Sequence, residues 1–221
     1  MKKKKKDFRL VWKAMFPTDA KRVLDIGCFT GKETQHLIKD QKAQVVGIEI
    51  NPKAANEAKK VLTHVICADA SEICDLPYAD GYFDCLIYGG VIGAFKDPIA
   101  TISKHARYLS HDGYLLFHAP NIRFYKVIRM LLCQGVWDYM PHGILYDVYV
   151  RNYTLKNYIE LLEELGFELL DVKKNIRGNS FLKGLNAIVF HALDGFLTYE
   201  YYFKAKRTQT VKKPKRKKNI F

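Results

Sequence analysis

Short apolar runs that each end at an acidic or glycine residue recur along the first third of the chain. The three runs are 23–26, 44–50 and 64–67. They are rich in Val and Ile and are bounded by polar residues, which is typical of buried parallel strands. Helical patterns over 31–38 and 53–60 follow the first two runs. Because the strand ends lie about twenty residues apart, as successive strand–helix units require, the pattern predicts an α/β fold.

The pattern continues beyond residue 80. Further strands are predicted over 82–88, 114–118 and 167–172, and helices over 98–110 and 155–165, with Thr154 as N-cap of the last. Asp112-Gly113 predicts a turn. The segment 198–206 alternates and is rich in aromatic residues, a composition that indicates an edge strand.

Two segments lie outside this strand–helix alternation. Residues 121–152 and 178–195 are predicted to be insertions with helical apolar spacing. The first follows the fifth strand, at the sheet edge where open α/β folds bind ligands. Its aromatic residues therefore predict a wall or lid of a substrate site, and additional core packing is the alternative.

The loop after the first strand reads Asp25-Ile-Gly-Cys-Phe-Thr-Gly31. Gly27 allows a positive φ, and Gly31 lets the start of the helix lie against the strand. A strand, a glycine turn and a helix start allow backbone to approach a ligand closely, although an ordinary strand-to-helix turn is the alternative. A dinucleotide site would require glycine at Phe29 and Lys32, so this spacing disfavours it.

Side chains at three further strand ends are candidates for the same site. Glu49 ends the second strand, where a carboxylate can accept hydrogen bonds from both ribose hydroxyls, and Asp69-Ala70 ends the third. His118 ends the fifth strand and can act as a base near neutral pH. An exposed acid or a packed histidine is the alternative for each position.

The glycine loop resembles motif I of the class I S-adenosylmethionine-dependent methyltransferases, Asp-x-Gly-x-x-x-Gly, with Phe29 where this family commonly has glycine. The run Tyr82-Phe83-Asp84 is similar to the type 11 members. The resemblance covers residues 20–206. It implies a three-layer Rossmann-like fold whose seven-stranded sheet has the order 3-2-1-4-5-7-6, with strand 7 antiparallel and helical insertions after strands 5 and 6.

The resemblance also implies S-adenosylmethionine as cofactor and S-adenosylhomocysteine as product. The residues expected to hold it are Asp25, Gly27, Cys28, Phe29, Gly31, Glu49, Ile50, Asp69, Ala70, Tyr88 and Gly89. A hydroxyl acceptor benefits from a general base. His118 is the candidate for this role, with Tyr125, His142 and Asp147 as alternatives.

Three segments resemble a subgroup associated with cell-surface polysaccharide synthesis. They are 120–123, 135–139 and 143–145. The following segment, 146–154, lacks the histidine that this subgroup usually has there. The expected function is methyl transfer, as O-methylation by in-line displacement, to a small molecule or glycan. Absence of an Asp/Asn-Pro-Pro-Tyr motif after the fourth strand disfavours methylation of a base nitrogen. An RNA methyltransferase and a catalytically silent binding module are the alternatives.

The formal net charge of +13 is concentrated at the two ends of the chain. Residues 1–13 hold seven Lys and Arg and residues 204–221 hold nine, which leaves the intervening chain almost neutral. We therefore expect a basic amphipathic segment over 1–19, a methyltransferase domain over 20–206 and a basic disordered tail over 207–221. A nucleic-acid groove in the body is disfavoured.

The basic ends allow three interpretations. They can bind an anionic membrane, with Phe8, Leu10, Val11, Trp12 and Phe16 as an interfacial helix; they can bind RNA; or they can be solubilising ends. No signal peptide or run of 18 apolar residues is present, which predicts a cytoplasmic protein that can associate peripherally with the inner membrane surface. The five cysteines form no C-x-x-C pair, so no metal site is expected.

Overall fold

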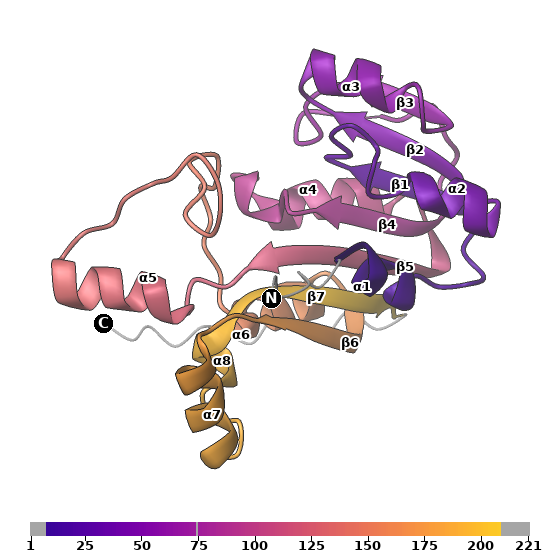
Figure 1. The fold of residues 1–221 in the computed structure, drawn as a ribbon. Helices are drawn as coiled ribbons and strands as arrows, with labels where there is room; N and C mark the ends of the chain where they lie inside the picture. The colour runs from indigo at the N-terminus through magenta and orange to yellow at the C-terminus, as the bar shows by residue number, and fades with distance from the viewer. Residues whose placement is uncertain (1–7, 74, 209–221) are drawn as a thin grey trace.

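The computed structural model describes residues 8–73 and 75–208. A single sheet has the strand order β3-β2-β1-β4-β5-β7-β6 (Figure 1). The strands are β1 (Arg22–Ile26), β2 (Gln44–Glu49), β3 (His64–Cys67), β4 (Phe83–Gly89), β5 (Leu109–Pro120), β6 (Phe167–Ile176) and β7 (Thr198–Arg207). All pairs among β1 to β5 are parallel, and β7 is antiparallel to both neighbours. This confirms the sheet order and the reversed strand that the resemblance implied.

The prediction that the last strand lies at an edge is wrong. β7 pairs with β5 on one side and with β6 on the other, so β6 is the edge strand. Tyr201 and Phe203 are buried on one face of the sheet and Tyr202 on the other. Phe203 stacks on Phe117 of β5 at 4.2 Å between ring centroids. The aromatic alternation therefore reflects an interior strand that is covered on both faces.

Helices cover both faces of the sheet and create two hydrophobic cores. The helices α1 (Phe8–Met15), α2 (Gln35–Gln41) and α3 (Pro52–Ala58) contribute to the first core, and α4 (Pro98–Ala106) and α6 (Leu155–Glu164) to the second. Neighbouring residues of a strand divide between the two, as Val23 and Leu24 do. Successive strand side chains point to opposite faces, so near-continuous apolar strands require this double cover.

Several predicted boundaries differ from those in the structure. α2 begins at Gln35, because the preceding residues form the turns of the glycine loop. α4 ends at Ala106, and the predicted turn at 112–113 lies within β5. Phe83 pairs with Leu109 and Cys85 with Tyr114, so the intervening β5 residues form an irregularity that is opposite a single residue of β4. The turn-forming residues therefore kink a strand here.

The predicted start of α6 is confirmed. The Thr154 side chain accepts a hydrogen bond from the Asn157 backbone nitrogen, and the Asn157 side chain accepts one from the Thr154 nitrogen. This reciprocal pair satisfies backbone donors that the first turn of the helix would otherwise leave unpaired. Gly166, with φ of 77°, follows the helix.

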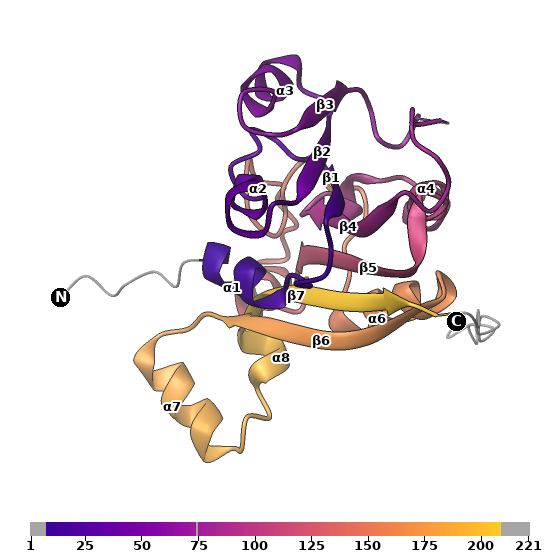
Figure 2. The same cartoon turned by 90° about the vertical axis from the view of Figure 1, so that its right-hand side faces the viewer.

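Both insertions contain helices that project away from the sheet (Figure 1), and the projection of the second insertion is also seen in Figure 2. The first insertion contains α5 (Tyr125–Arg129) and a π-helical turn, η2 (Met130–Gln134). The second contains α7 (Ser180–Ile188) and α8 (Asp194–Leu197). A 3₁₀ turn, η1 (Ile92–Ala94), follows β4.

The N-terminal segment is partly integrated into the domain. Met15 and Phe16 are buried in the first core, so the expectation that Phe16 contacts a membrane is wrong. The lysine-rich runs that were assigned to the tails lie in 1–7 and 209–221, outside the described residues, although β7 extends one residue into the predicted tail. Within the described chain, no helix has the length and apolarity needed to cross a membrane.

Candidate functional site

The glycine loop between β1 and α2 is fastened to the end of β2. The backbone nitrogens of Gly27 and Cys28 both donate to the Ile48 carbonyl oxygen, at 2.8 and 3.1 Å. Gly27 has φ of 74°, and a Cβ added there would lie 2.3 Å from a Val91 methyl carbon. Gly31 has φ of 71°, and its Cβ would lie 2.8 Å from Leu62. Both glycines are therefore required by backbone conformation and by space.

Phe29 occupies the middle of this loop with φ of 48°, in the left-handed region. Its side chain is 65% exposed, so it fills no core position. A side chain in this conformation costs about 1 kcal/mol. The Phe29 backbone nitrogen donates to Glu49 Oε2 at 2.9 Å, which helps to hold the loop in this shape.

Glu49 and Asp25 are buried carboxylates behind the loop. Glu49 accepts from Phe29 through one oxygen and from the Asn51 backbone nitrogen through the other, at 2.8 Å. Asp25 accepts from the Thr34 hydroxyl at 2.6 Å. Burial raises the pKa of Asp25 to about 7, and the nearby carboxylates Glu33 and Glu49 add to the increase. A substantial fraction of Asp25 is thus protonated at neutral pH.

The end of β3 is held by a network that the sequence did not reveal. Asp69 accepts from the backbone nitrogen and hydroxyl of Ser71. His105 of α4 is buried, and its ring bonds the Ala70 carbonyl and the Tyr88 hydroxyl, both at 3.0 Å. Burial lowers the pKa of His105 to about 4, so the imidazole is neutral. In the sequence, the burial of His105 was indicated only by its position three residues after Ile102, on the apolar face of α4.

A cleft of about 450 Å³ opens between the glycine loop and the ends of β4 and β5. Its lining residues are Asp25, Gly27, Cys28, Phe29, Thr30, Lys32, Glu33, Gly89 and His118. Six of these were predicted from the sequence, and Thr30, Lys32 and Glu33 were not. Cys28 is buried within the loop, and burial raises the pKa of its thiol well above the ordinary value.

Other predicted residues lie beside the cleft. Glu49, Ile50, Asp69 and Ala70 follow one another along the ends of β2 and β3, and Gly31 is buried under the loop. The Tyr88 side chain is fully buried in the core and bonded to His105, so only its backbone can face a ligand. The β4 residue that lines the cleft is Gly89.

His118 lies between two carboxylates at the end of β5. Its Nε2 is 3.9 Å from Glu33 Oε2, and its Nδ1 is 3.8 Å from Glu200 Oε2. The ring stacks on Tyr202 of β7 at 5.3 Å between centroids. The alternatives Tyr125, His142 and Asp147 are not among the residues that line the described cleft.

Glu200 was not predicted as a site residue. Its Oε1 accepts from the Asn175 side-chain nitrogen at 2.6 Å and from the Tyr202 hydroxyl at 3.1 Å, while Arg177 is 3.7 Å away. The other oxygen, Oε2, is the one that faces His118. The antiparallel β5–β7 register brings Glu200 to this position, and no local motif signals such a pairing.

These features fit a nucleotide-like cofactor. The cleft lies within the usual size range of small-molecule sites. Its floor is a glycine loop that allows close backbone approach, and a buried carboxylate ends the adjacent strand. Exposed Ile50 offers an apolar surface next to that carboxylate, as a base ring requires.

Comparison with known proteins gives the family. A family model described as a methyltransferase domain matches residues 4–172. Ajmaline N-methyltransferase from Rauvolfia serpentina is 31% identical over 181 residues, or 76% of this chain, and the match spans 62% of that protein.

Solved structures agree in fold. A SAM-dependent methyltransferase from Archaeoglobus fulgidus has a TM-score of 0.65 at 20% identity, covering 90% of this chain and 91% of that one. A SAM-dependent methyltransferase from Thermotoga maritima, described as a possible histamine N-methyltransferase, has a TM-score of 0.63 at 18% identity, covering 90% and 87%. The chain therefore belongs to the methyltransferase-domain family of class I enzymes, which use S-adenosylmethionine as methyl donor.

Proposed function

We propose that this enzyme methylates a proton-bearing oxygen or nitrogen of a small molecule, with His118 as general base. The carrying observation is the position of His118, in the wall of the cleft opposite the glycine loop and within ion-pair distance of Glu200. The similarity to ajmaline N-methyltransferase supports a small-molecule acceptor. It also makes nitrogen a candidate acceptor atom beside the oxygen that the sequence analysis expected.

The cofactor residues predicted from the sequence are part of this proposal. Backbone of the loop 27–31 and of Tyr88-Gly89 would hold the cofactor, with Asp25 buried behind the loop. Glu49 and Asp69 accept hydrogen bonds from it, since each carboxylate oxygen has more than one lone pair. Exposed Ile50 and half-buried Ala70 contact its apolar ring faces. The cofactor supplies a methyl group bound to a sulfonium sulfur. The sulfur leaves as a neutral thioether, so no acid is needed to protonate the leaving group.

The chain contributes proton transfer and exclusion of water. The Glu200 carboxylate favours a proton on Nδ1 of His118, which leaves Nε2 as the atom that accepts the proton of the acceptor. The imidazolium that forms is stabilised by Glu200 and by Glu33, on opposite sides of the ring. Asn175 and Tyr202 fix the Glu200 carboxylate and so act as positioning residues.

Ligand binding is tested first by thermal unfolding with S-adenosylhomocysteine, with NAD as control. At about 100 times the dissociation constant, a ligand adds roughly 2.7 kcal/mol. For a chain of this size the expected increase in Tm is about 5–10 °C. An increase with NAD alone, or with neither ligand, would contradict the proposed cofactor site.

The His118→Asn variant tests the chemistry. General-base removal is expected to reduce kcat by about 10²–10⁴-fold. The increase in Tm with S-adenosylhomocysteine should remain, because the cofactor-side residues are unchanged. His111→Asn, at an exposed position of the same strand, is the matched control and should retain full activity. An unchanged kcat in His118→Asn would overturn the assignment of the base.

A sugar hydroxyl is the second candidate acceptor. The segments that resemble the polysaccharide-associated subgroup include Trp137 and Tyr139, which are exposed on the first insertion. The acceptor panel should therefore contain amines, phenols and nucleotide sugars, assayed by radioactive methyl transfer. Transfer to RNA instead would support the alternative in which the basic ends capture the substrate, and no transfer with tight cofactor binding would support a binding module.

A further inference from the structure

Helix α7 of the second insertion carries its apolar face on the outside. Phe181, Leu185 and Ile188 recur at helical spacing and are all exposed, Phe181 and Ile188 to 75% each. Phe190, directly after the helix, is 93% exposed. Asn186, on the opposite face, is buried. Surface helices normally bury the apolar stripe and expose the polar one, so α7 has the reverse orientation.

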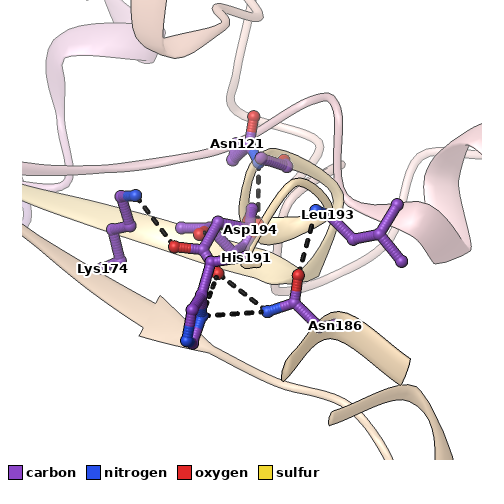
Figure 3. A network of polar contacts seen from close by, with 8 residues as sticks. Asn121, Lys174, Asn186, His191, Leu193 and Asp194 are labelled. Carbon is purple, nitrogen blue, oxygen red and sulfur yellow. Dashed lines mark hydrogen bonds and ion pairs between the residues drawn. The ribbon is translucent and has the colours of Figure 1, made fainter. Parts of the chain in front are cut away.

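A polar network fixes this orientation (Figure 3). The Asn186 side-chain nitrogen donates to Asp194 Oδ1 at 2.8 Å, and its oxygen accepts from the Leu193 backbone nitrogen at 2.9 Å. Asp194 also accepts from Lys174 of β6 at 3.0 Å and lies 3.3 Å from His191. The polar face of α7 is therefore tied to α8 and β6, and the apolar face must point outward.

The two insertions leave the body side by side. The Asn121 side chain, at the base of the first insertion, donates to the Gly195 carbonyl of α8 at 2.8 Å. The Arg123 guanidinium lies 4.7 Å from the centre of the Phe196 ring. Beyond this junction, η2 exposes Leu131 and Leu132. In Figure 1 α5 extends to the left of the sheet and α7 projects below it.

Both outward-facing segments are cationic as well as apolar. Residues 122–137 contain three Lys and Arg and no acid. On α7 the cation is Lys183, because Lys173, Lys174 and Arg177 precede the helix and pair with Asp171, Asp194 and Glu200. Lys126 and Arg129 on α5, and Lys183 on α7, are exposed beside the apolar residues. Large apolar side chains flanked by cations match the boundary between acyl chains and anionic headgroups. A purely apolar protein partner would leave these cations unpaired.

We propose that the outward faces of α7 and η2 form a binding surface for an anionic lipid bilayer. We call it the lipid surface and define it as Leu131, Leu132, Phe181, Leu185, Ile188 and Phe190, with Lys126, Arg129 and Lys183 as its cations. The apolar side chains enter the headgroup–acyl boundary, and the cations lie among the lipid phosphates. None of these residues lines the cleft, and none belongs to the basic ends of the chain.

The test is co-sedimentation of the full chain with phosphatidylcholine vesicles, with and without phosphatidylserine. The triple variant Phe181→Ser, Ile188→Ser, Phe190→Ser is expected to lose at least tenfold in partitioning to the anionic vesicles. Leu170→Ser, an exposed leucine on β6 outside both insertions, is the matched control and should partition like the unaltered chain. A second variant, Lys126→Gln, Arg129→Gln, Lys183→Gln, should bind more weakly and depend less on salt.

Three outcomes would overturn the proposal. The first is partitioning of the triple variant like that of the unaltered chain, which would assign lipid binding to the basic ends. The second is equal binding of the unaltered chain to neutral and anionic vesicles. The third is a dimer of the unaltered chain that the triple variant disrupts while its lipid binding stays the same. The increase in Tm with S-adenosylhomocysteine reports folding and the cleft independently. If the unaltered chain shows no such increase but still binds the anionic vesicles, that result counts against the proposed function and leaves the lipid surface standing.

Discussion

The two halves of the sheet differ in how their sites are built. Around β1, β2 and β3 the important groups are close in sequence: a seven-residue loop, an acid at the end of the next strand and another at the end of the third. Around β5, β6 and β7 they are far apart, because His118 meets Glu200 only through an antiparallel pairing. The first half is compact, and the second carries both projecting insertions.

This difference separates what a family shares from what an individual enzyme needs. The first half depends on backbone hydrogen bonds and on glycines that leave no space for a side chain, as at Gly27, where a Cβ would clash with Val91. The second half exposes residues of the insertions, where substitution costs little stability. The family therefore identifies the cofactor, and it does not identify the acceptor.

The largest expected effect concerns Asp25, in the first half. The pKa of Asp25 is about 7 in the folded chain, and its ordinary value is 3.8. Between these pH values the folded state therefore binds more protons than the unfolded state. Stability should therefore fall as pH rises from about 4 to 7, by roughly 4 kcal/mol in total. Urea unfolding at pH 5 and 8 should show about 3 kcal/mol of this loss in the unaltered chain and a much smaller loss in Asp25→Asn. Asp138→Asn, exposed on the first insertion, should keep the full pH dependence; an unchanged slope in Asp25→Asn would contradict the assignment.

Gly27→Ala compared with Gly135→Ala contrasts the packing of the two halves. Both glycines have positive φ, but a Cβ at 27 meets Val91 and one at 135 meets nothing within 4 Å. We expect a loss of about 3 kcal/mol at 27, from backbone strain and overpacking, and about 1 kcal/mol at 135, from strain alone. Denaturant titration measures both values. Equal losses would show that the loop at 27 relaxes freely.

The smallest expected effect is a gain. Phe29→Gly removes an exposed side chain from a left-handed residue and should stabilise the chain by about 1 kcal/mol. Phe190→Gly, at φ of 50° in the second insertion, should give a similar gain in denaturant titration. If Phe29→Gly destabilises the chain and Phe190→Gly does not, the Phe29 side chain supports its loop in a way that the Phe190 side chain does not.

The sequence by itself determined the fold class and most of the residues that line the cleft. Continuous apolar runs, glycine-dependent turns and strand-end acids are all patterns of a few residues, so the sequence around Asp25, Gly27 and Glu49 carried this information locally. The N-cap at Thr154 could be predicted for the same reason. The resemblance to known methyltransferases supplied the strand order that periodicity alone did not, and the aromatic alternation of β7 pointed instead to an edge.

Tertiary structure decided how residues far apart in the chain meet. The burial of Tyr88, its bond to His105, and the placement of Glu200 beside His118 each depend on which elements become neighbours. The outward apolar face of α7 was also invisible, because helical spacing gives the stripe and not the side to which it turns. That side is fixed by hydrogen bonds from Asn186 to the loop and helix that follow α7, and a buried amide must keep its partners even when apolar side chains are left in contact with water.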